Sequence, residues 1–224
     1  MEISSKTASQ VEVFLVAGVC SATPAPDRCL DMQNPISRTA YYTLGVRAWD
    51  AKQPKPLCGD SFASAFMNAE AEQIWGQFKD LQKPNSANAA RHGIIDEHLS
   101  MELAADPTAQ VIVIGAGFDT RAFRLTGGRW VEVDEPSIIT CKETRLPAAG
   151  APNPLTRVPI AFAHESIVER LAAHSGKDTT HVVVEGVLMY LTHAEHRELL
   201  QSLQQLFPRH FIYCDLMRQS FFER

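Results

Sequence analysis

The spacing of apolar residues is clearest in the second half of the chain. Residues 111–114 form a continuous β-branched run that ends at Gly115. Such a run is typical of a strand that is buried on both faces of a parallel sheet. Further strands are predicted at residues 130–133, 155–162, 181–185 and 210–215, with helix-compatible segments at 137–146, 165–173 and 194–207. Strands that alternate with helices predict an α/β fold, with a mostly parallel sheet and helices on both faces.

The first half of the chain has helical spacing instead. Apolar side chains recur at helical intervals in residues 37–49 and 61–78, which predicts two helices. A longer helix is predicted at residues 87–105, with Asn85 or Ser86 as its N-terminal cap. We therefore expect the N-terminal part of the fold to be helical.

This pattern divides the chain into three parts. Residues 1–34 contain Pro24 and Pro26 and are predicted to be an extension or linker, residues 35–105 a helical cap, and residues 106–224 the α/β core. A chain of 224 residues is long enough for one domain with a large buried core, whereas two full domains would be cramped. The cap and the core are therefore predicted to form one structural domain.

Charge and hydropathy narrow the classes of partner. The net charge is −5 and no basic stripe is visible, which argues against a nucleic-acid partner. No apolar run approaches the length of a membrane span, so no membrane partner is expected. The sequence therefore predicts a small-molecule substrate.

The number and spacing of the cysteines indicate the redox state of the cellular compartment. The chain has five, an odd number, without pairs at zinc-site or redox spacing. This usage favours a reducing compartment and predicts a cytoplasmic protein without a metal site. The short apolar run at residues 11–19 resembles the core of a signal peptide, but the basic segment that should precede it is missing. The alternative for this run is an extra helix or a partly ordered extension.

Three small residues follow the first predicted core strand and mark a candidate ligand loop. Gly115, Ala116 and Gly117 lie at its carboxyl end, where the backbone must turn sharply and can approach a ligand closely. Thr120 stands where the dinucleotide-binding pattern has a third glycine, which disfavours an NAD(P)-dependent oxidoreductase without excluding it. A tight turn without a ligand remains the alternative for this loop.

Two acids end later predicted strands. Asp134 follows the glycine loop at the distance expected of a carboxylate that binds the hydroxyls of an adenosine ribose. The alternative is that Asp134 caps the following helix. Glu185 ends an apolar strand and could accept a hydrogen bond from a ligand ammonium group. A structural glutamate paired with an arginine is an equally good interpretation of Glu185.

Several motifs in order carry a resemblance to a known family. They are SRTAYYTLGVRAW, ARHGIIDEHL, VIVIGAGFDTRAFRL, WVEVDEP and VVVEGVLMYLT, within residues 35–215. Together they resemble the leucine carboxyl methyltransferase family, which includes protein-phosphatase carboxyl methyltransferases and microbial small-molecule O-methyltransferases. Ser37 stands where the phosphatase type has lysine, so the small-molecule branch is favoured. The resemblance implies a Rossmann-like class I methyltransferase that uses S-adenosyl-L-methionine to methylate a carboxylate or hydroxyl.

The resemblance also implies roles for particular residues. The loop from Gly115 to Gly117 would pass under the methionine part of the cofactor, and Asp134 would hold its ribose. Arg91 matches the arginine that pairs with the cofactor carboxylate, and Glu185 matches the glutamate beside the cofactor's amino acid end. Asp119 and Arg121 follow the loop and are expected to brace it rather than contact the ligand.

Two departures from the family pattern affect these expectations. Relatives often have Asp or Asn where this chain has Ala161, which weakens the expected adenine contact, although Phe162 could stack on the ring. Relatives also continue through two strands after the one predicted at residues 210–215, so the C-terminal strands of the sheet are expected to be missing. An exposed sheet edge would favour a homo-oligomer. A cofactor-binding protein with little or no activity is therefore a further alternative.

The sequence gives weaker signals for catalytic residues and for residues that bind the methyl acceptor. A carboxylate nucleophile needs no general base, and none of the histidines is assigned as one. Arg47 could clamp an acidic substrate, but a solvated surface arginine is the simpler interpretation. Tyr190 could line the acceptor pocket, and a core aromatic is its alternative.

Overall fold

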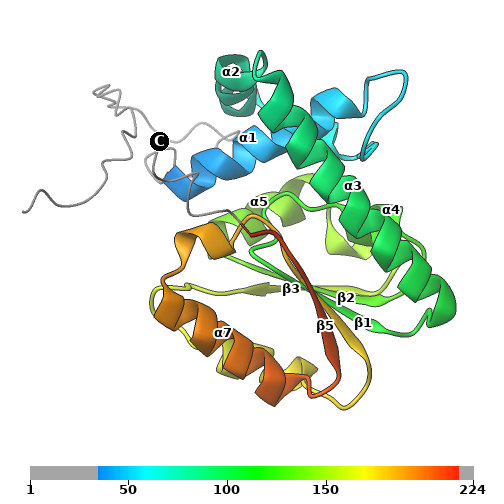
Figure 1. The fold of residues 1–224 in the computed structure, drawn as a ribbon, viewed down its shortest axis with the longest axis vertical. Helices are drawn as coiled ribbons and strands as arrows, with labels where there is room; N and C mark the ends of the chain where they lie inside the picture. The colour runs from blue at the N-terminus through cyan, green and yellow to red at the C-terminus, as the bar shows by residue number, and fades with distance from the viewer. Residues whose placement is uncertain (1–34, 217–224) are drawn as a thin grey trace, which may run out of the picture.

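A computed structural model describes residues 35–216, with side chains from residue 38 onward. In this part of the chain five parallel strands form one sheet in the order β3-β2-β1-β4-β5 (Figure 1). The fold is therefore Rossmann-like α/β, as predicted. The strands are β1 (Gln110–Ile114), β2 (Arg129–Asp134), β3 (Leu155–Pro159), β4 (Thr180–Val184) and β5 (His210–Cys214).

Side chains alternate between two hydrophobic layers, which explains the continuous apolar pattern of β1. Ile112 and Ile114 pack in a cluster with residues of α6 (Ile167–Leu171) and α7 (His193–Leu206). Val111 and Val113 pack in another cluster with residues of the long helix α3 (Gln82–Ala105). Since α7 and α3 lie on opposite sides of the sheet (Figure 1), helices cover both of its faces, as predicted.

The N-terminal helices agree with the predicted helical block but differ in their bounds. Helix α1 covers Pro35–Asp50. The single helix predicted at 61–78 is wrong, because a short 3-10 turn, Ala63–Phe66, is separated from α2, Ala69–Phe78. The Asn68 side chain accepts a hydrogen bond from the Ala71 amide at 2.8 Å, so a new N-terminal cap begins α2 here.

Helix α3 begins earlier than the sequence pattern suggests. It starts at Gln82, because Pro84 lies in its first turn, where no intrahelical amide donor is needed. The cap predicted at Asn85 or Ser86 is therefore wrong. Asn85 is 3% exposed, and its side-chain amide donates to the carbonyl oxygens of Phe78 and Lys79. This residue joins the ends of α2 and α3 instead.

The carboxyl ends of the strands carry turns and short helices. Strand β3 stops at Pro159 rather than at the predicted residue 162, and the chain turns over the following residues. Helix α5, Pro136–Arg145, follows β2 with proline as its first residue. The remaining short elements are α4 (Arg121–Arg124) and the 3-10 turns Ala148–Gly150, Ala172–His174 and Leu188–Tyr190.

The predicted cap and core share their packing. Ile95, Leu99 and Leu103 of α3 are buried against the sheet, so this helix belongs to the core as much as to the cap. That packing favours the interpretation of one domain, while the boundary at residue 106 stays a prediction. None of the described helices combines the length and apolar character that a bilayer span requires.

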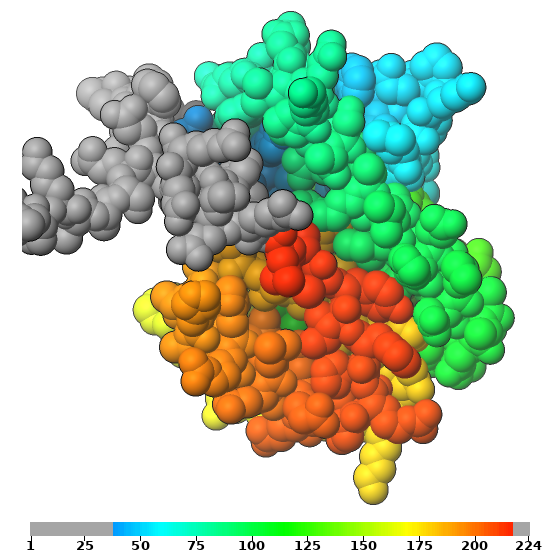
Figure 2. All heavy atoms as spheres, viewed as in Figure 1, coloured from blue at the N-terminus to red at the C-terminus, as the bar shows by residue number. Residues whose placement is uncertain are grey.

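Strand β5 forms one edge of the described sheet. It pairs with β4, and Phe211 on β5 is 56% exposed. In the space-filling view the surface is hollowed between α7 and β5 (Figure 2). The oligomer expected from an exposed edge stays a prediction.

Candidate functional site

A large cavity lies over the carboxyl ends of the strands. Its volume is about 1110 Å³, and its walls come from α1, α3, α7 and the turns that follow β1 to β5. In a parallel sheet these turns converge on one edge, which is where such folds bind ligands. The residues predicted for the site all line this cavity: Arg47, Arg91, Gly115, Ala116, Gly117, Asp134, Phe162, Glu185 and Tyr190.

The loop after β1 depends on its two glycines. Gly115 and Gly117 have φ angles of +64° and +47°, a region that residues with a side chain rarely adopt. A Cβ atom at Gly115 would lie 2.4 Å from Cγ2 of Val187. The loop is therefore a tight turn, and it also exposes backbone to the cavity.

Asp134 connects this loop to the end of β2. Its Oδ2 accepts a hydrogen bond from the Gly117 amide, and its Oδ1 one from the Glu135 amide, both at 2.6 Å. Asp134 is 8% exposed, and burial raises its pKa to about 6 although the two amide bonds act in the opposite direction. The capping alternative for Asp134 is wrong, because Glu135 occupies the N-cap position of α5.

A carboxylate oxygen can accept more than one hydrogen bond. Since Asp134 uses one amide per oxygen and lines the cavity, it keeps capacity for hydroxyl donors of a ligand. The geometry thus combines a structural role in the loop with an available acceptor.

Arg91 lies between two acids at the other end of the cavity. Its Nε is 3.0 Å from Glu185 Oε1, and its Nη1 is 2.9 Å from Asp215 Oδ2. Within the described part of the chain, Nη2 of Arg91 makes no hydrogen bond or ion pair, although the guanidinium lines the cavity. This arrangement leaves a charged donor for a ligand anion.

Glu185 is bound on both oxygens. Its Oε1 faces Arg91, and its Oε2 accepts from Arg121 at 2.8 Å and contacts His92 at 3.0 Å. Burial would raise the pKa of Glu185, but Arg121, His92 and Arg91 hold it well below its usual range. The alternative of a structural glutamate paired with arginine therefore describes much of its environment, and the same side chain also lines the cavity.

Arg121 is a buried hub behind the site. Its side chain is fully buried and forms ion pairs with Asp96, Asp119 and Glu185. These acids raise the pKa of Arg121 against the opposing effect of burial. It also donates to the carbonyl oxygen of His92 at 3.2 Å. These contacts agree with the expectation that Arg121 braces the loop, and Asp119 lies between this hub and the cavity.

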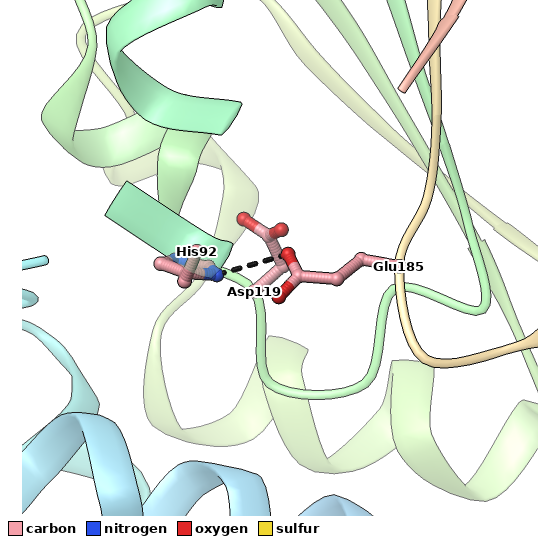
Figure 3. A group of neighbouring side chains, drawn as sticks. All are labelled: His92, Asp119 and Glu185. Carbon is pink, nitrogen blue, oxygen red and sulfur yellow. Dashed lines mark hydrogen bonds and ion pairs between the residues drawn. The ribbon is translucent and has the colours of Figure 1, made fainter. Parts of the chain in front are cut away.

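His92, Asp119 and Glu185 form a compact group that resembles a metal ligand set (Figure 3). One ligand atom from each lies within 4.8 Å of the others. However, the Arg121 guanidinium contacts all three side chains. Because an arginine already supplies the positive charge that these acids need, we assign no metal to this group.

Both ring nitrogens of His92 contact charged side chains. Its Nδ1 is 3.0 Å from Glu185 Oε2, while its Nε2 is 3.0 Å from Nη2 of Arg124. A neutral ring with hydrogen on Nδ1 would donate to Glu185 and accept from Arg124, but Nδ1 also lies 2.8 Å from the donor Nη2 of Arg121. Burial and the neighbouring Arg121 lower the pKa of His92, which agrees with this neutral form.

Arg47 differs from its predicted environment. It is 6% exposed, its Nη1 pairs with Asp60 at 2.7 Å, and its Nη2 donates to the Phe118 carbonyl oxygen at 3.0 Å. The expected solvated surface position is wrong, since α1 packs this face inside the protein. A substrate-clamping role stays a prediction and would require these bonds to be exchanged.

Two aromatic side chains stand open toward the cavity. Phe162 and Tyr190 are 41% and 42% exposed and both line the cavity. The core alternative for Tyr190 is therefore wrong. Both rings are available to cover the apolar parts of a ligand.

The sequence interpretation missed two acids of the site. Asp215 accepts from the Gly186 amide at 2.6 Å and pairs with Arg91, and Glu135 reaches the turn after β3. Asp215 directly follows β5 as Glu185 follows β4, so the reasoning applied to Glu185 would have found it. Glu135 follows Asp134 and had no separate signal.

Comparison with known proteins adds a family assignment to this geometry. The sequence model of the leucine carboxyl methyltransferase family matches residues 40–204. The chain belongs to this family. The match includes α3, the glycine loop, the end of β2 and the end of β4, which position the site.

Individual relatives are more distant. A protein of Parafrankia is 31% identical over 186 residues, which cover 76% of this chain and 59% of that protein. A protein of Mycobacterium marinum is 26% identical over 194 residues, covering 79% of this chain and 64% of that protein. Both are provisionally named S-adenosyl-L-methionine-dependent methyltransferases. The chain thus matches less than two thirds of the length of either relative.

Proposed function

We propose that this chain forms the cofactor-binding part of an S-adenosyl-L-methionine-dependent methyltransferase. Its acceptor would be a small molecule that is methylated on a carboxylate or hydroxyl oxygen. The proposal rests mainly on one observation, the row of Arg91, the glycine loop and Asp134 along one edge of the sheet. The names of the relatives support the same cofactor.

The groups in this row fit the cofactor part by part. Nη2 of Arg91, which has no partner among the described residues, suits the cofactor carboxylate, and Glu185 Oε1 suits the ammonium group. Asp134 suits the ribose hydroxyls. The backbone of the Gly115–Gly117 loop can approach closely because its glycines carry no side chain. These groups follow the strand order β4, β1, β2, so they are spread along the edge as an extended ligand requires.

When bound, S-adenosyl-L-methionine would supply an activated methyl group. The residues of the chain would then act by orienting the reactants and excluding water, which is where most of the rate enhancement of such a displacement can arise. The cavity, about 1110 Å³ in volume, exceeds the usual size of a site for one small ligand. It therefore has room for an acceptor beside the cofactor, where Tyr190 and Arg47 are the proposed contacts.

The described residues that line the cavity also indicate which chemical group of the acceptor is methylated. His92 is the histidine that lines the cavity in this part of the chain, and its ring nitrogens face Glu185 and Arg124. It is therefore poorly placed to remove a proton from an acceptor. A carboxylate acceptor needs no such base, which favours this group over a hydroxyl.

Parallel calorimetric titrations test the cofactor assignment. We expect S-adenosyl-L-methionine and S-adenosylhomocysteine to bind and NADH and NADPH to give no response. Binding of NADPH without any response to the two adenosyl ligands would overturn the proposal. Transfer of labelled methyl to a panel of small carboxylic acids and phenols, with the acids expected to react, then tests the acceptor class.

A further inference from the structure

The strand order indicates where the site continues beyond Asp134. Arg91 and Glu185 meet at the end of β4, the glycine loop follows β1, and Asp134 ends β2. The next strand in the order is β3 (Figure 1). A ligand that extends along the edge therefore places its next part over the turn that follows β3, at residues 160–165.

Residues 160–164 of this turn include no acid, and residue 161 is alanine. Two acids nevertheless line the cavity beside it, Glu135 and Glu165. Glu135 Oε1 accepts a hydrogen bond from the Phe162 amide at 3.2 Å, and Glu165 Oε2 accepts one from the Ala161 amide at 2.7 Å. Glu135 therefore holds the turn from the end of β2, and Glu165 holds it from its own last residue.

The two acids differ in whether a carboxylate oxygen remains available to accept a hydrogen bond from a ligand. Glu165 uses its other oxygen, Oε1, to pair with Arg170, so both of its oxygens are engaged. Glu135 Oε2 has no hydrogen-bond or ion-pair partner among residues 38–216. Glu135 directly follows Asp134, and its other oxygen holds the backbone amide of Phe162, whose 41% exposed side chain lines the same cavity. The available acceptor thus lies between Asp134 and the turn that carries Phe162.

We propose that Glu135 recognises the amino group of the cofactor's adenine, while Phe162 covers the ring. This inference rests on the proposed function. A carboxylate oxygen is an acceptor only, so it suits the donor at C6 of adenine and opposes the carbonyl oxygen at C6 of hypoxanthine. The site would thereby select an aminopurine ligand.

A comparison of two ligands tests the role of Glu135 directly. S-adenosylhomocysteine carries the amino group, and S-inosylhomocysteine carries a carbonyl group in its place. We expect the unaltered chain to bind the adenosyl ligand at least about tenfold more tightly, the effect of one hydrogen bond to a charged group. The two dissociation constants, measured by calorimetry, give the ratio.

The variant Glu135→Gln then separates recognition from folding. A glutamine amide can donate to the carbonyl of the inosyl ligand, so binding of S-inosylhomocysteine should strengthen while binding of S-adenosylhomocysteine weakens. The ratio should fall by about tenfold or more. A loss of structure would weaken both ligands together. Glu169→Gln, which removes the charge of an exposed residue of α6 outside the cavity, should leave the ratio unchanged.

The outcomes distinguish this inference from the proposal on which it rests. If both ligands bind the unaltered chain and Glu135→Gln leaves their ratio within about twofold, less than one hydrogen bond is worth, Glu135 does not read the base. The proposed function then stands and the inference fails. If neither ligand binds the unaltered chain, the proposed function fails and the inference fails with it.

Discussion

At the scale of single residues, the site is built from acids that already hold protein groups. Asp134 binds two backbone amides, and Glu185 binds Arg91, Arg121 and His92. Because a carboxylate accepts several hydrogen bonds, such an acid can keep its position in the fold and still receive a ligand donor. This double use explains why ligand-binding and structural interpretations of these acids were hard to separate from the sequence.

The raised pKa of Asp134 predicts how cofactor affinity depends on pH. Burial raises this pKa to about 6, so the carboxyl group becomes protonated as the pH falls through that value. The charged form is the better acceptor for ribose hydroxyls, and affinity for S-adenosylhomocysteine should therefore fall between about pH 7.5 and pH 5. Calorimetry across this range measures the effect.

The variant Asp134→Ala provides the comparison. It should weaken binding by about 1.5–3 kcal/mol at pH 7.5, the range for a hydrogen bond to a charged group. Its remaining affinity should change less between the two pH values than that of the unaltered chain. Equal affinity of both proteins at pH 7.5 would contradict the ribose-binding role.

Asp215 is predicted to act through Arg91. It pairs with Nη1 of Arg91 and accepts from the Gly186 amide, so it orients the guanidinium toward the cavity. Asp215→Asn should weaken S-adenosylhomocysteine about tenfold. In a chain that already carries Arg91→Ala, the same change should have little further effect, because the group that it positions is gone. Additive effects in this double-mutant cycle would rule out the positioning role.

At the scale of elements, α3 connects the helical part of the fold to the site. Its carboxyl-terminal half packs on the sheet through Leu99 and Leu103, and its middle carries Arg91 and His92. The loop at residues 51–59 also packs against this helix. In this loop the Asp50 carboxylate accepts hydrogen bonds from the backbone amides of Leu57, Cys58 and Gly59. A helix held on both sides can place Arg91 accurately.

Gly93 allows this loop to lie against α3, and its substitution gives a prediction with an unusual sign. Alanine usually stabilises a helix interior by about 1 kcal/mol relative to glycine. At Gly93, however, a Cβ atom would lie 2.2 Å from the carbonyl oxygen of Leu57. Gly93→Ala should therefore lower the free energy of unfolding, measured by urea denaturation, because the loop must move.

Gly76 in α2 is the matched control for Gly93. Apart from the backbone of its own helix, a Cβ atom there meets no described atom within 4 Å, so Gly76→Ala should raise the free energy of unfolding by as much as about 1 kcal/mol. If both substitutions stabilise the protein, the close packing of the loop on α3 is refuted.

At the scale of the whole molecule, buried charges connect elements that are far apart in the sequence. Arg121 joins Asp96 on α3, Asp119 in the loop after β1 and Glu185 at the end of β4. Arg124 adds a second bond to Asp96. These pairs hold the helix and two strand ends in one arrangement around the cavity.

Removal of this hub should have a large effect on stability. Arg121→Ala would leave buried carboxylates without their main counter-charge, which costs about 3–5 kcal/mol when one partner of a buried pair is lost. Urea denaturation measures the change. Arg129→Ala is the control, because its pair with Asp178 is mostly exposed, and it should change stability by less than about 0.5 kcal/mol. Similar small effects of both variants would contradict the assigned role of Arg121.

Local sequence was informative where one chemical requirement acts on neighbouring residues. The β-branched run of β1 and its glycines predicted a strand and a turn at their correct places, because burial and positive φ angles restrict the residue types directly. The sequence was less informative on helix bounds. The breaks at Met67–Asn68 and before Pro84 depend on caps and contacts between helices, which apolar spacing does not record.

Sequence by itself determined the parallel α/β order of strands and helices and the acids at the carboxyl ends of β2 and β4, since each follows from residue types along a short segment. Tertiary structure alone decided which charges meet. Arg47 is buried against Asp60, Arg91 lies between Glu185 and Asp215, and Glu135 reaches across to the turn after β3. The physical reason is that an ion pair depends on distance and burial in space, and residues 124 positions apart, such as Arg91 and Asp215, carry no local sign of their contact.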